Sequence, residues 1–353
     1  GLLVCGPGIV SAQLKERLWR CAGALALPVL ADPLSGLRAG PAPDHRITGY
    51  DALLRNAAAA DRLRPDWVLR IGRAPVSKTL SQWLTGLPTL LIDRGGGWSD
   101  PSHDVVERLI AEPTAVLDWL VEAGPIDPDQ SWLDAWIIGD RAVRTLADRH
   151  LAESHWCEGH LIRALVARMA DGESLFCANS LPIRQLDTWS GPIEARIAIV
   201  GNRGTSGIDG QLSTLAGLNA AGHRCWGLLG DLSFCHDLSG LLLADRLKRP
   251  VVVINNGGGR IFDYLPQRGL PGLERLWRTP VAPDLAALAQ AFGLRHRRAE
   301  DAESLVRALD DADAADGATG IVEVMIDADA SRTMHLEFWR NVADARSLTS
   351  AVK

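Results

Sequence analysis

Short apolar runs alternate with longer amphipathic stretches along the whole chain. In its first part, Leu2–Cys5, Trp67–Ile71 and Thr89–Ile92 predict buried strands, and Ser11–Ala22 predicts a helix with Ser11 as its N-cap. Five runs in the second part also predict strands: Ser174–Cys177, Arg196–Val200, Cys225–Leu229, Val251–Ile254 and Gly320–Ile326. Their near-continuous Val, Ile and Leu residues indicate burial on both faces, which is typical of a doubly wound parallel sheet.

A proline-rich stretch separates the two parts of the chain. Residues 124–129 read Gly-Pro-Ile-Asp-Pro-Asp, a composition typical of a boundary, and Trp132–His150 predicts a connecting helix after it. We therefore predict an α/β fold with two doubly wound parallel-sheet domains. Residues 1–128 form a Rossmann-like domain in this interpretation, and residues 129–353 contain the connecting helix and the second sheet.

Charge and hydropathy argue against several classes of function. The 353 residues carry a formal net charge of −6, so we expect no binding to nucleic acid. The apolar runs are much shorter than the roughly 20 residues of a membrane span, and the first residues show no secretory signal. The six cysteines form no C-x-x-C pair. We therefore expect a cytoplasmic protein with reduced, mostly buried thiols and no membrane partner.

Two polar motifs end neighbouring predicted strands. Gly230-Asp231 follows the first strand, a helix is predicted over Leu232–Leu247, and the next strand ends at Asn255-Asn256-Gly257-Gly258-Gly259. Because ligands of open α/β sheets bind outside the carboxyl ends of the strands, we expect Asp231 and Asn256 to lie side by side. With a backbone carbonyl from the glycine loop they offer the hard oxygen ligands that Mg²⁺ prefers. In the alternative interpretation, Asp231 only caps the following helix.

The spacing of these motifs resembles the diphosphate-binding signature of thiamine-diphosphate (ThDP) enzymes. Carried over residue by residue, the resemblance implies that Asp231, the Asn256 side chain and the Gly258 carbonyl bind Mg²⁺ (or Mn²⁺). It also implies ThDP contacts along the same two loops. The residues concerned are Leu232, Ser233 and Gly259.

Further strings narrow the resemblance to one family of ThDP enzymes. Each of the first two follows a predicted strand, the third extends the glycine loop, and the fourth lies upstream. They are residues 176–184 (FCANSLPIR), 201–210 (GNRGTSGIDG), 258–267 (GGRIFDYLPQ) and 77–84 (SKTLSQWL). Together with residues 230–238 (GDLSFCHDL), they are similar to the 2-succinyl-5-enolpyruvyl-6-hydroxy-3-cyclohexene-1-carboxylate (SEPHCHC) synthases, the MenD family. The resemblance implies decarboxylation of 2-oxoglutarate and addition of the succinyl-semialdehyde carbanion to isochorismate, in menaquinone or phylloquinone biosynthesis.

The resemblance also implies roles for side chains around the cofactor. Both substrates are carboxylates, so Arg184 and Arg203 are candidates to bind them, with Ser180 and Lys78 as weaker candidates. Ile208 would hold ThDP in its bent conformation. An apolar wall beside the thiazolium ring would be formed by Ile261, Phe262 and Leu265. The alternatives are surface or ion-paired arginines and plain core packing.

The family implies partners that this chain does not contain. A glutamate that hydrogen-bonds the aminopyrimidine ring belongs to an N-terminal pyrimidine-binding domain, and no segment here matches that domain. We therefore expect a fragment that is inactive alone, from a parent that forms a homodimer or homotetramer. Two other functions stay open at this point: another ThDP-dependent 2-oxoacid decarboxylase or carboligase, and a non-catalytic module that keeps the ThDP fold.

Two other motifs receive structural interpretations. Gly6-Pro7-Gly8 follows the first strand but lacks the third glycine of a dinucleotide loop, so we expect no nucleotide in this domain. Residues 155–160 crowd two histidines, Cys157 and Glu158 together like metal ligands. Because Ser154 is a suitable N-cap, this segment is interpreted as the start of a helix rather than a zinc site.

Overall fold

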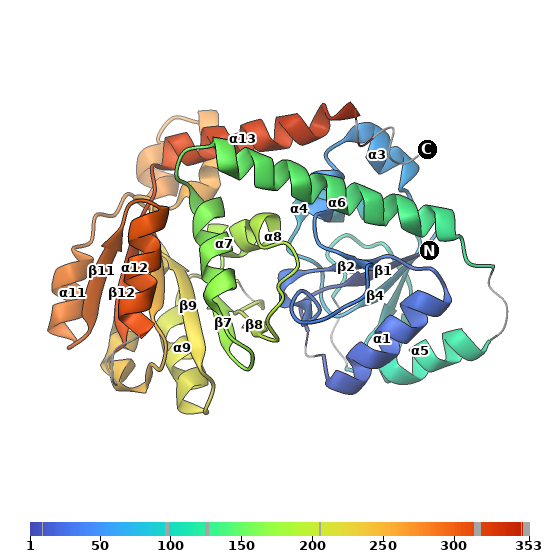
Figure 1. The fold of residues 1–353 in the computed structure, drawn as a ribbon, viewed down its shortest axis with the longest axis horizontal. Helices are drawn as coiled ribbons and strands as arrows, with labels where there is room; N and C mark the ends of the chain where they lie inside the picture. The colour runs from blue at the N-terminus through green and yellow to red at the C-terminus, as the bar shows by residue number, and fades with distance from the viewer. Residues whose placement is uncertain are drawn as a thin grey trace. The chain divides into compact units, whose positions relative to one another are not determined.

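The computed structural model describes residues 1–8, 10–95, 99–123, 127–204, 206–313, 319–346 and 348. The chain separates into two compact units, each built on a six-stranded sheet with helices on its faces (Figure 1). Unit 1 is Gly1–Ala152, Gly191–Glu194 and Glu337–Lys353; unit 2 is Glu153–Ser190 and Ala195–Leu336. Among the described residues all strand pairings are parallel, which confirms the predicted class of two doubly wound parallel sheets. Residues 124–126 of the predicted domain boundary lie outside the described residues.

The sheet of unit 1 has the strand order β3-β2-β1-β4-β5-β6, which is the order of a Rossmann fold. Its strands are β1 (Leu2–Cys5), β2 (Val29–Ala31), β3 (Arg46–Ile47), β4 (Val68–Ile71), β5 (Thr89–Ile92) and β6 (Val105–Leu109). Its helices are α1 (Ala12–Ala24), α2 (Tyr50–Leu53), α3 (Ala57–Arg62), α4 (Lys78–Leu84), α5 (Pro113–Glu122) and α6 (Gln130–Glu153), with a 3₁₀ turn η1 (Pro33–Ser35). The side chain of Ser11 accepts a hydrogen bond from the Leu14 amide, as predicted for an N-cap.

The glycine loop after β1 has a packing role. A Cβ atom added to Gly6 would lie 1.7 Å from the carbonyl oxygen of Arg73, in the loop after β4. The Gly6 amide donates to the Ile71 carbonyl at 3.0 Å, and the Arg73 amide donates to the Pro7 carbonyl at 2.9 Å. Two backbone segments therefore meet where a side chain would not fit, which supports the structural interpretation of this motif.

The sheet of unit 2 has the strand order β11-β12-β10-β9-β7-β8. Its strands are β7 (Ser174–Cys177), β8 (Ala198–Val200), β9 (Cys225–Gly230), β10 (Val251–Asn255), β11 (Arg295–Ala299) and β12 (Gly320–Met325). Its helices are α7 (Glu158–Arg168), α8 (Leu181–Trp189), α9 (Gln211–Ala220), α10 (Asp231–His236), α11 (Leu285–Ala291), α12 (Ala302–Asp313) and the start of α13 (Ala328–Ala343). Short 3₁₀ or π turns are η2 (Leu238–Arg246), η3 (Arg260–Tyr264), η4 (Pro266–Gly269) and η5 (Glu274–Arg278).

Two local predictions in unit 2 were wrong. The helix predicted over Leu232–Leu247 is broken at Asp237, where the backbone has φ −130° and ψ 38°. The carboxylate of Asp237 accepts hydrogen bonds from the amide and hydroxyl of Ser213 at 2.7 and 3.0 Å, which favours the break. Helix α7 begins at Glu158 with Cys157 as N-cap, so Ser154 is not the cap.

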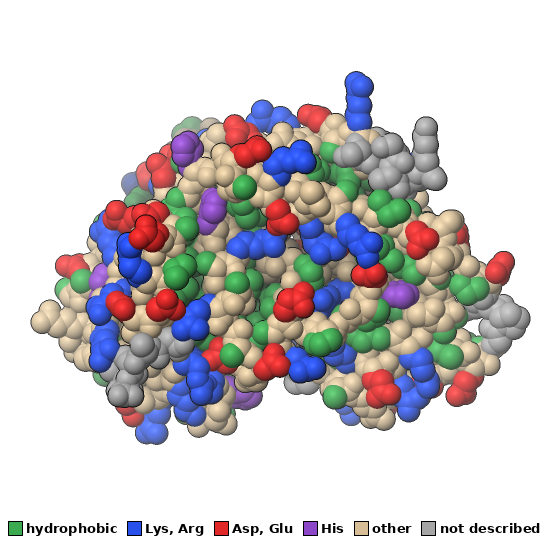
Figure 2. All heavy atoms as spheres, viewed as in Figure 1, with side chains coloured by type: hydrophobic (Ala, Val, Ile, Leu, Met, Phe, Trp, Pro, Cys, Tyr) green, Lys and Arg blue, Asp and Glu red, His purple; other side chains and the backbone are tan. Residues whose placement is uncertain are grey.

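Surface and thiol properties agree with the composition. The six cysteines are free, and five are buried; burial raises the pKa of Cys5 and Cys157 to about 12. Basic and acidic side chains are interspersed over the face shown in Figure 2. Within the described residues, no helix combines the length and the apolar character that a bilayer crossing requires.

Candidate functional site

A pocket in unit 2 opens at the carboxyl ends of β7, β9 and β10. The chain order reverses around β7, because β8 and β9 lie on its two sides, and such a switch point is the usual ligand site of an open α/β sheet. Nine of the ten predicted cofactor residues line the pocket: Ile208, Asp231, Leu232, Ser233, Asn256, Gly258, Gly259, Ile261 and Phe262. The structure thus brings together residues from three separate loops.

Asp231 connects the loops after β9 and β10. Its side chain is buried, with 1% of the residue exposed. One carboxylate oxygen accepts the Leu232 amide at 2.6 Å, and the other accepts the amides of Asn256, Gly257 and Gly258 at 3.1, 2.7 and 3.0 Å. Burial raises the pKa of Asp231, and these amide hydrogen bonds oppose the rise.

These contacts show that Asp231 is more than the cap of the helix that follows it. The N-cap of α10 is Gly230, and Asp231 is the first helical residue. Three of the four amides that it binds belong to the loop after β10, so its carboxylate connects that loop to the start of α10. The carboxylate, the Asn256 side chain and Gly258 meet at one pocket, as the motif spacing predicts.

The glycine loop requires glycine at position 258. Gly258 has φ +119°, and a Cβ atom there would lie 2.6 Å from the carbonyl oxygen of Arg278. The neighbouring Gly259 amide donates to that same carbonyl at 2.6 Å. The loop is therefore held between the Asp231 carboxylate on one side and the backbone at Arg278 on the other.

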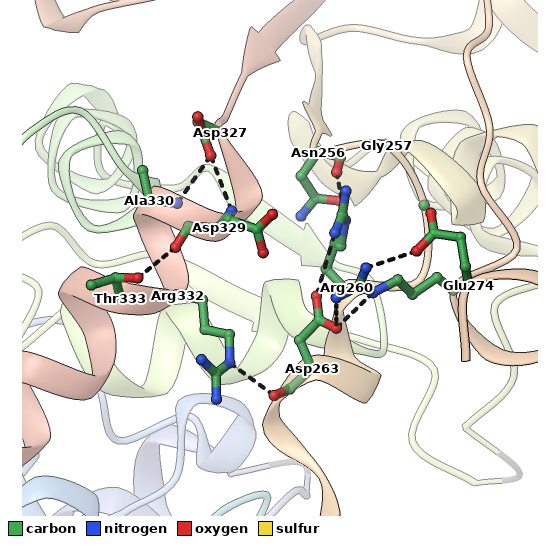
Figure 3. Close-up of polar contacts among 12 residues, drawn as sticks. Asn256, Gly257, Arg260, Asp263, Glu274, Asp327, Asp329, Ala330, Arg332 and Thr333 are labelled. Carbon is green, nitrogen blue, oxygen red and sulfur yellow. Dashed lines mark hydrogen bonds and ion pairs between the residues drawn. The ribbon is translucent and has the colours of Figure 1, made fainter. Parts of the chain in front are cut away.

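Charged side chains fix the segment that follows the loop (Figure 3). Arg260 lines the pocket, and its guanidinium donates to the Asn256 carbonyl at 3.0 Å and pairs with Asp263 at 3.5 Å. Asp263 is buried and also accepts from Arg278 at 2.7 Å, while Arg332 donates to its backbone carbonyl at 2.9 Å. Buried ion pairs with complete hydrogen bonding fix geometry, so this cluster holds η3 against η5 and α13.

The loops after β7 and β8 are joined through Asn179. This buried side chain donates to the carbonyls of Asn202 and Gly207, both at 2.7 Å. Its own oxygen accepts from the Arg203 guanidinium at 2.9 Å. Arg184 is exposed on the first turns of α8 and donates to the Ser180 carbonyl at 2.6 Å. Ser180 lines the pocket, whereas Arg203, in the loop after β8, and Arg184, on α8, are not among its lining residues.

Ser180 has a strained backbone, with φ +73° and ψ −131°. Only glycine adopts this region without cost, and strain of this kind is concentrated at functional sites. We predict that Ser180→Gly raises the free energy of unfolding by about 1 kcal/mol, because the strain is relieved. Chemical denaturation of the variant, with Ser180→Ala as the control that keeps the strain, measures this. Equal stability of the two variants would contradict the strain.

The remaining predicted residues lie outside the pocket lining. Leu265 is half-buried between η3 and η4, and it does not line the pocket. Lys78 is exposed in the first turn of α4, which belongs to unit 1. Sequence reasoning missed Glu158, a pocket residue at the start of α7 that is only 3% exposed. The residues around Glu158 predict the start of a helix, and no local sequence pattern indicates that Glu158 lies near the loop at Asn256.

Comparison with known proteins identifies the family. A family model described as the middle domain of thiamine pyrophosphate matches residues 1–177. The chain belongs to this family. The match covers the first half of the chain, including β7, which leads into the pocket.

Curated relatives extend the similarity over nearly the whole chain. The chain is 34% identical over 98% of its length to the SEPHCHC synthase of Listeria innocua. It is 35% identical over 97% of its length to that of Geobacillus kaustophilus, and 36% identical over 98% to that of Chloroflexus aurantiacus. These alignments cover 60–61% of each relative, so the chain spans about three fifths of their length. The resemblance predicted from the motifs is confirmed.

Proposed function

We propose that this chain carries the diphosphate and Mg²⁺ half of a ThDP site in a SEPHCHC synthase. The observation that supports this most strongly is the meeting of Asp231, Asn256 and Gly258 at one pocket, at the switch point of a doubly wound sheet. The proposed substrates are 2-oxoglutarate and isochorismate, which the resemblance of the motifs to this family implies. We further propose a cytoplasmic homo-oligomer, whose order light scattering would give.

The donor set of the pocket fits a divalent cation with a diphosphate. Asp231 and Glu158 place two buried carboxyl groups at the pocket, and Arg260 is bound to Asp263. An anionic diphosphate alone would be repelled by such carboxylates, whereas Mg²⁺ would be attracted by them and would neutralise the phosphates. The loop from Asn256 to Gly259 has no bulky side chain near the Asp231 carboxylate, so phosphate oxygens could approach its backbone closely.

The residues around this half-site have separable roles in the proposed reaction. When bound, ThDP supplies the electron sink for decarboxylation. Ile208, Ile261 and Phe262 are apolar pocket residues that would exclude water beside it. Arg203 and Arg184 would bind substrate carboxylates, since a guanidinium can donate two parallel hydrogen bonds. In Arg203, the bond to Asn179 fixes the guanidinium before substrate arrives.

The proposed activity is tested in the protein at its full natural length. We expect CO₂ release from 2-oxoglutarate that depends on ThDP and Mg²⁺, with the SEPHCHC product formed when isochorismate is added. Mass spectrometry of the product and a coupled CO₂ assay measure the two steps. Decarboxylation of pyruvate in preference to 2-oxoglutarate would favour a different ThDP enzyme, and no turnover of any 2-oxoacid would favour a non-catalytic module.

Arg203→Ala is expected to separate substrate binding from cofactor binding. Loss of a charge-assisted contact to a carboxylate costs about 2–5 kcal/mol, so kcat/KM for 2-oxoglutarate should fall by at least roughly 30-fold. ThDP affinity, measured by calorimetric titration, should stay within about threefold of wild type. Arg203→Lys should recover only part of the loss, because an ammonium cannot form the two-pronged contact. Weakened ThDP binding with unchanged substrate kinetics would show that the assigned role is wrong.

A further inference from the structure

Asp263 is a buried carboxylate beside the pocket for which the proposed reaction has no direct use. It lies in η3, is 2% exposed and is not among the residues that line the pocket. Its Oδ1 atom accepts from Nε and Nη2 of Arg278 at 2.7 and 2.6 Å, and its Oδ2 atom lies 3.5 Å from Nη1 of Arg260 (Figure 3). One carboxylate thus binds guanidinium groups from two separate segments. Burying a carboxylate is costly unless its partners are well placed, so this arrangement needs an explanation.

The first of these arginines, Arg260, contacts the glycine loop at two points. Its Nε atom donates to the Asn256 carbonyl at 3.0 Å, and its backbone amide donates to the Gly258 carbonyl at 2.8 Å. A carbonyl oxygen has two lone pairs, so the Gly258 oxygen keeps one for a metal ion. Arg260 therefore fixes the directions of two peptide groups in the loop that is proposed to hold the metal.

The second arginine, Arg278, supports the opposite side of the loop through its backbone. Its carbonyl accepts the Gly259 amide at 2.6 Å, and a Cβ atom on Gly258 would lie 2.6 Å from the same oxygen. The neighbouring Trp277 packs edge-on against the pocket residue Phe262, with ring centroids 5.3 Å apart. The position of Arg278 therefore determines where the loop and one apolar wall of the pocket lie.

We propose that Asp263 is a positioning residue that clamps the glycine loop through Arg260 on one side and Arg278 on the other. This inference rests on the proposed ThDP site and assigns a role to a residue outside the proposed ligand set. A loop that is already in place when the cofactor arrives reduces the ordering cost of binding, so the clamp should raise the affinity for ThDP. Asp231 holds the same loop by separate contacts, so losing the clamp should weaken binding without abolishing it.

Asp263→Asn tests the clamp because it keeps the shape of the side chain and removes its charge. We expect the Kd for ThDP at saturating Mg²⁺ to rise roughly tenfold, the lower end of the range for groups behind a metal ligand. At saturating ThDP, kcat for CO₂ release from 2-oxoglutarate should stay within about twofold of wild type, because the bound cofactor then holds the loop. Calorimetric titration and the CO₂ assay, in the protein at its full natural length, measure this split.

Arg260→Met tests one arm of the clamp alone. Methionine keeps an unbranched apolar stem, and the Arg260 side chain is 19% exposed, so this variant should fold even if Asp263→Asn does not. It should raise the Kd for ThDP by roughly threefold to tenfold. The double variant Asp263→Asn/Arg260→Met should bind ThDP about as weakly as Asp263→Asn alone, since residues that act as one unit are not additive.

Asp140→Asn is the matched control for loss of a buried, arginine-bound aspartate. Asp140 belongs to unit 1 and is also 2% exposed. Its carboxylate accepts the Thr48 amide at 2.8 Å and pairs with Arg144 at 2.9 Å. The substitution should lower the Tm and leave the Kd for ThDP unchanged, because Asp140 has no contact with the glycine loop.

The outcomes separate this inference from the proposed function. Wild-type Kd values in Asp263→Asn and Arg260→Met, or losses that multiply in the double variant, would overturn the clamp while the ThDP site stands. A wild-type protein that binds no ThDP in the presence of Mg²⁺ would overturn the site itself. Weaker, non-additive binding at Asp263 and Arg260, with unchanged binding in Asp140→Asn, supports the clamp, since general destabilisation would not spare the control.

Discussion

Asp231→Ala is expected to abolish Mg²⁺-dependent binding of ThDP. The substitution removes the anionic member of the proposed ligand set, and an amide and a carbonyl alone cannot hold Mg²⁺ against water. It also removes the acceptor of three amides in the loop after β10, so the loop loses the contact that places Asn256 and Gly258. We expect calorimetric titration with ThDP and Mg²⁺ to show a loss of affinity greater than the roughly 10–100-fold that is typical of losing a residue behind a metal ligand.

Asp237→Ala provides a matched control for this result. Asp237 lies six positions further along, is 6% exposed, and binds the amide and hydroxyl of Ser213 instead of the pocket loop. Its replacement should lower the free energy of unfolding by about 1–3 kcal/mol, the cost of unpaired buried groups, and leave ThDP affinity near wild type. Equal ThDP affinity in Asp231→Ala and wild type would remove Asp231 from the metal site.

The part of the site that lies at the ends of the strands could be predicted from the sequence. Gly230-Asp231 and Asn255-Asn256 each end an apolar run, and parallel strands bring such ends to one edge of the sheet. Contacts made across the unit could not be predicted in this way. Glu158 and Ser331 meet although 173 positions separate them, and neither carries a local pattern that indicates the other.

Local chemistry explains the elements that pattern reading missed. Strand β11 has the sequence Arg-His-Arg-Arg-Ala and lies at the edge of the sheet. Because an edge strand is largely exposed, it lacks the apolar run by which the other strands were predicted. His296 on that strand pairs with Glu323 on β12 at 2.8 Å, and Glu323 in turn accepts from Asn255 at 2.6 Å. The first asparagine of the motif therefore has a structural role: it ties β10 to β12, and Glu323 continues this contact to β11.

Gly258→Ala is expected to destabilise unit 2 and to impair the cofactor site together. The backbone at Gly258 has φ +119°, and the added methyl group would lie 2.6 Å from the Arg278 carbonyl oxygen, closer than Cβ atoms approach in proteins. Strain and overlap should lower the free energy of unfolding by at least about 2 kcal/mol. The loop can relieve the overlap only by moving away from Arg278, which would displace the carbonyl proposed to bind the metal.

Alanine substitutions at two other glycines provide a comparison for the stability and ThDP affinity of Gly258→Ala. Gly257→Ala is strained because φ is +79°, but the nearest atom to the added Cβ is a guanidinium nitrogen of Arg260 at 3.7 Å. The free energy of unfolding should therefore fall by only about 1–2 kcal/mol. Gly217→Ala lies in α9 with nothing within 4 Å and should stabilise the protein by roughly 0.5–1 kcal/mol. Denaturation midpoints and ThDP titrations of the three variants measure the series. If Gly258→Ala were as stable as Gly217→Ala and bound ThDP normally, the loop would not be held between Asp231 and the backbone at Arg278, and the proposed carbonyl ligand would lose its structural basis.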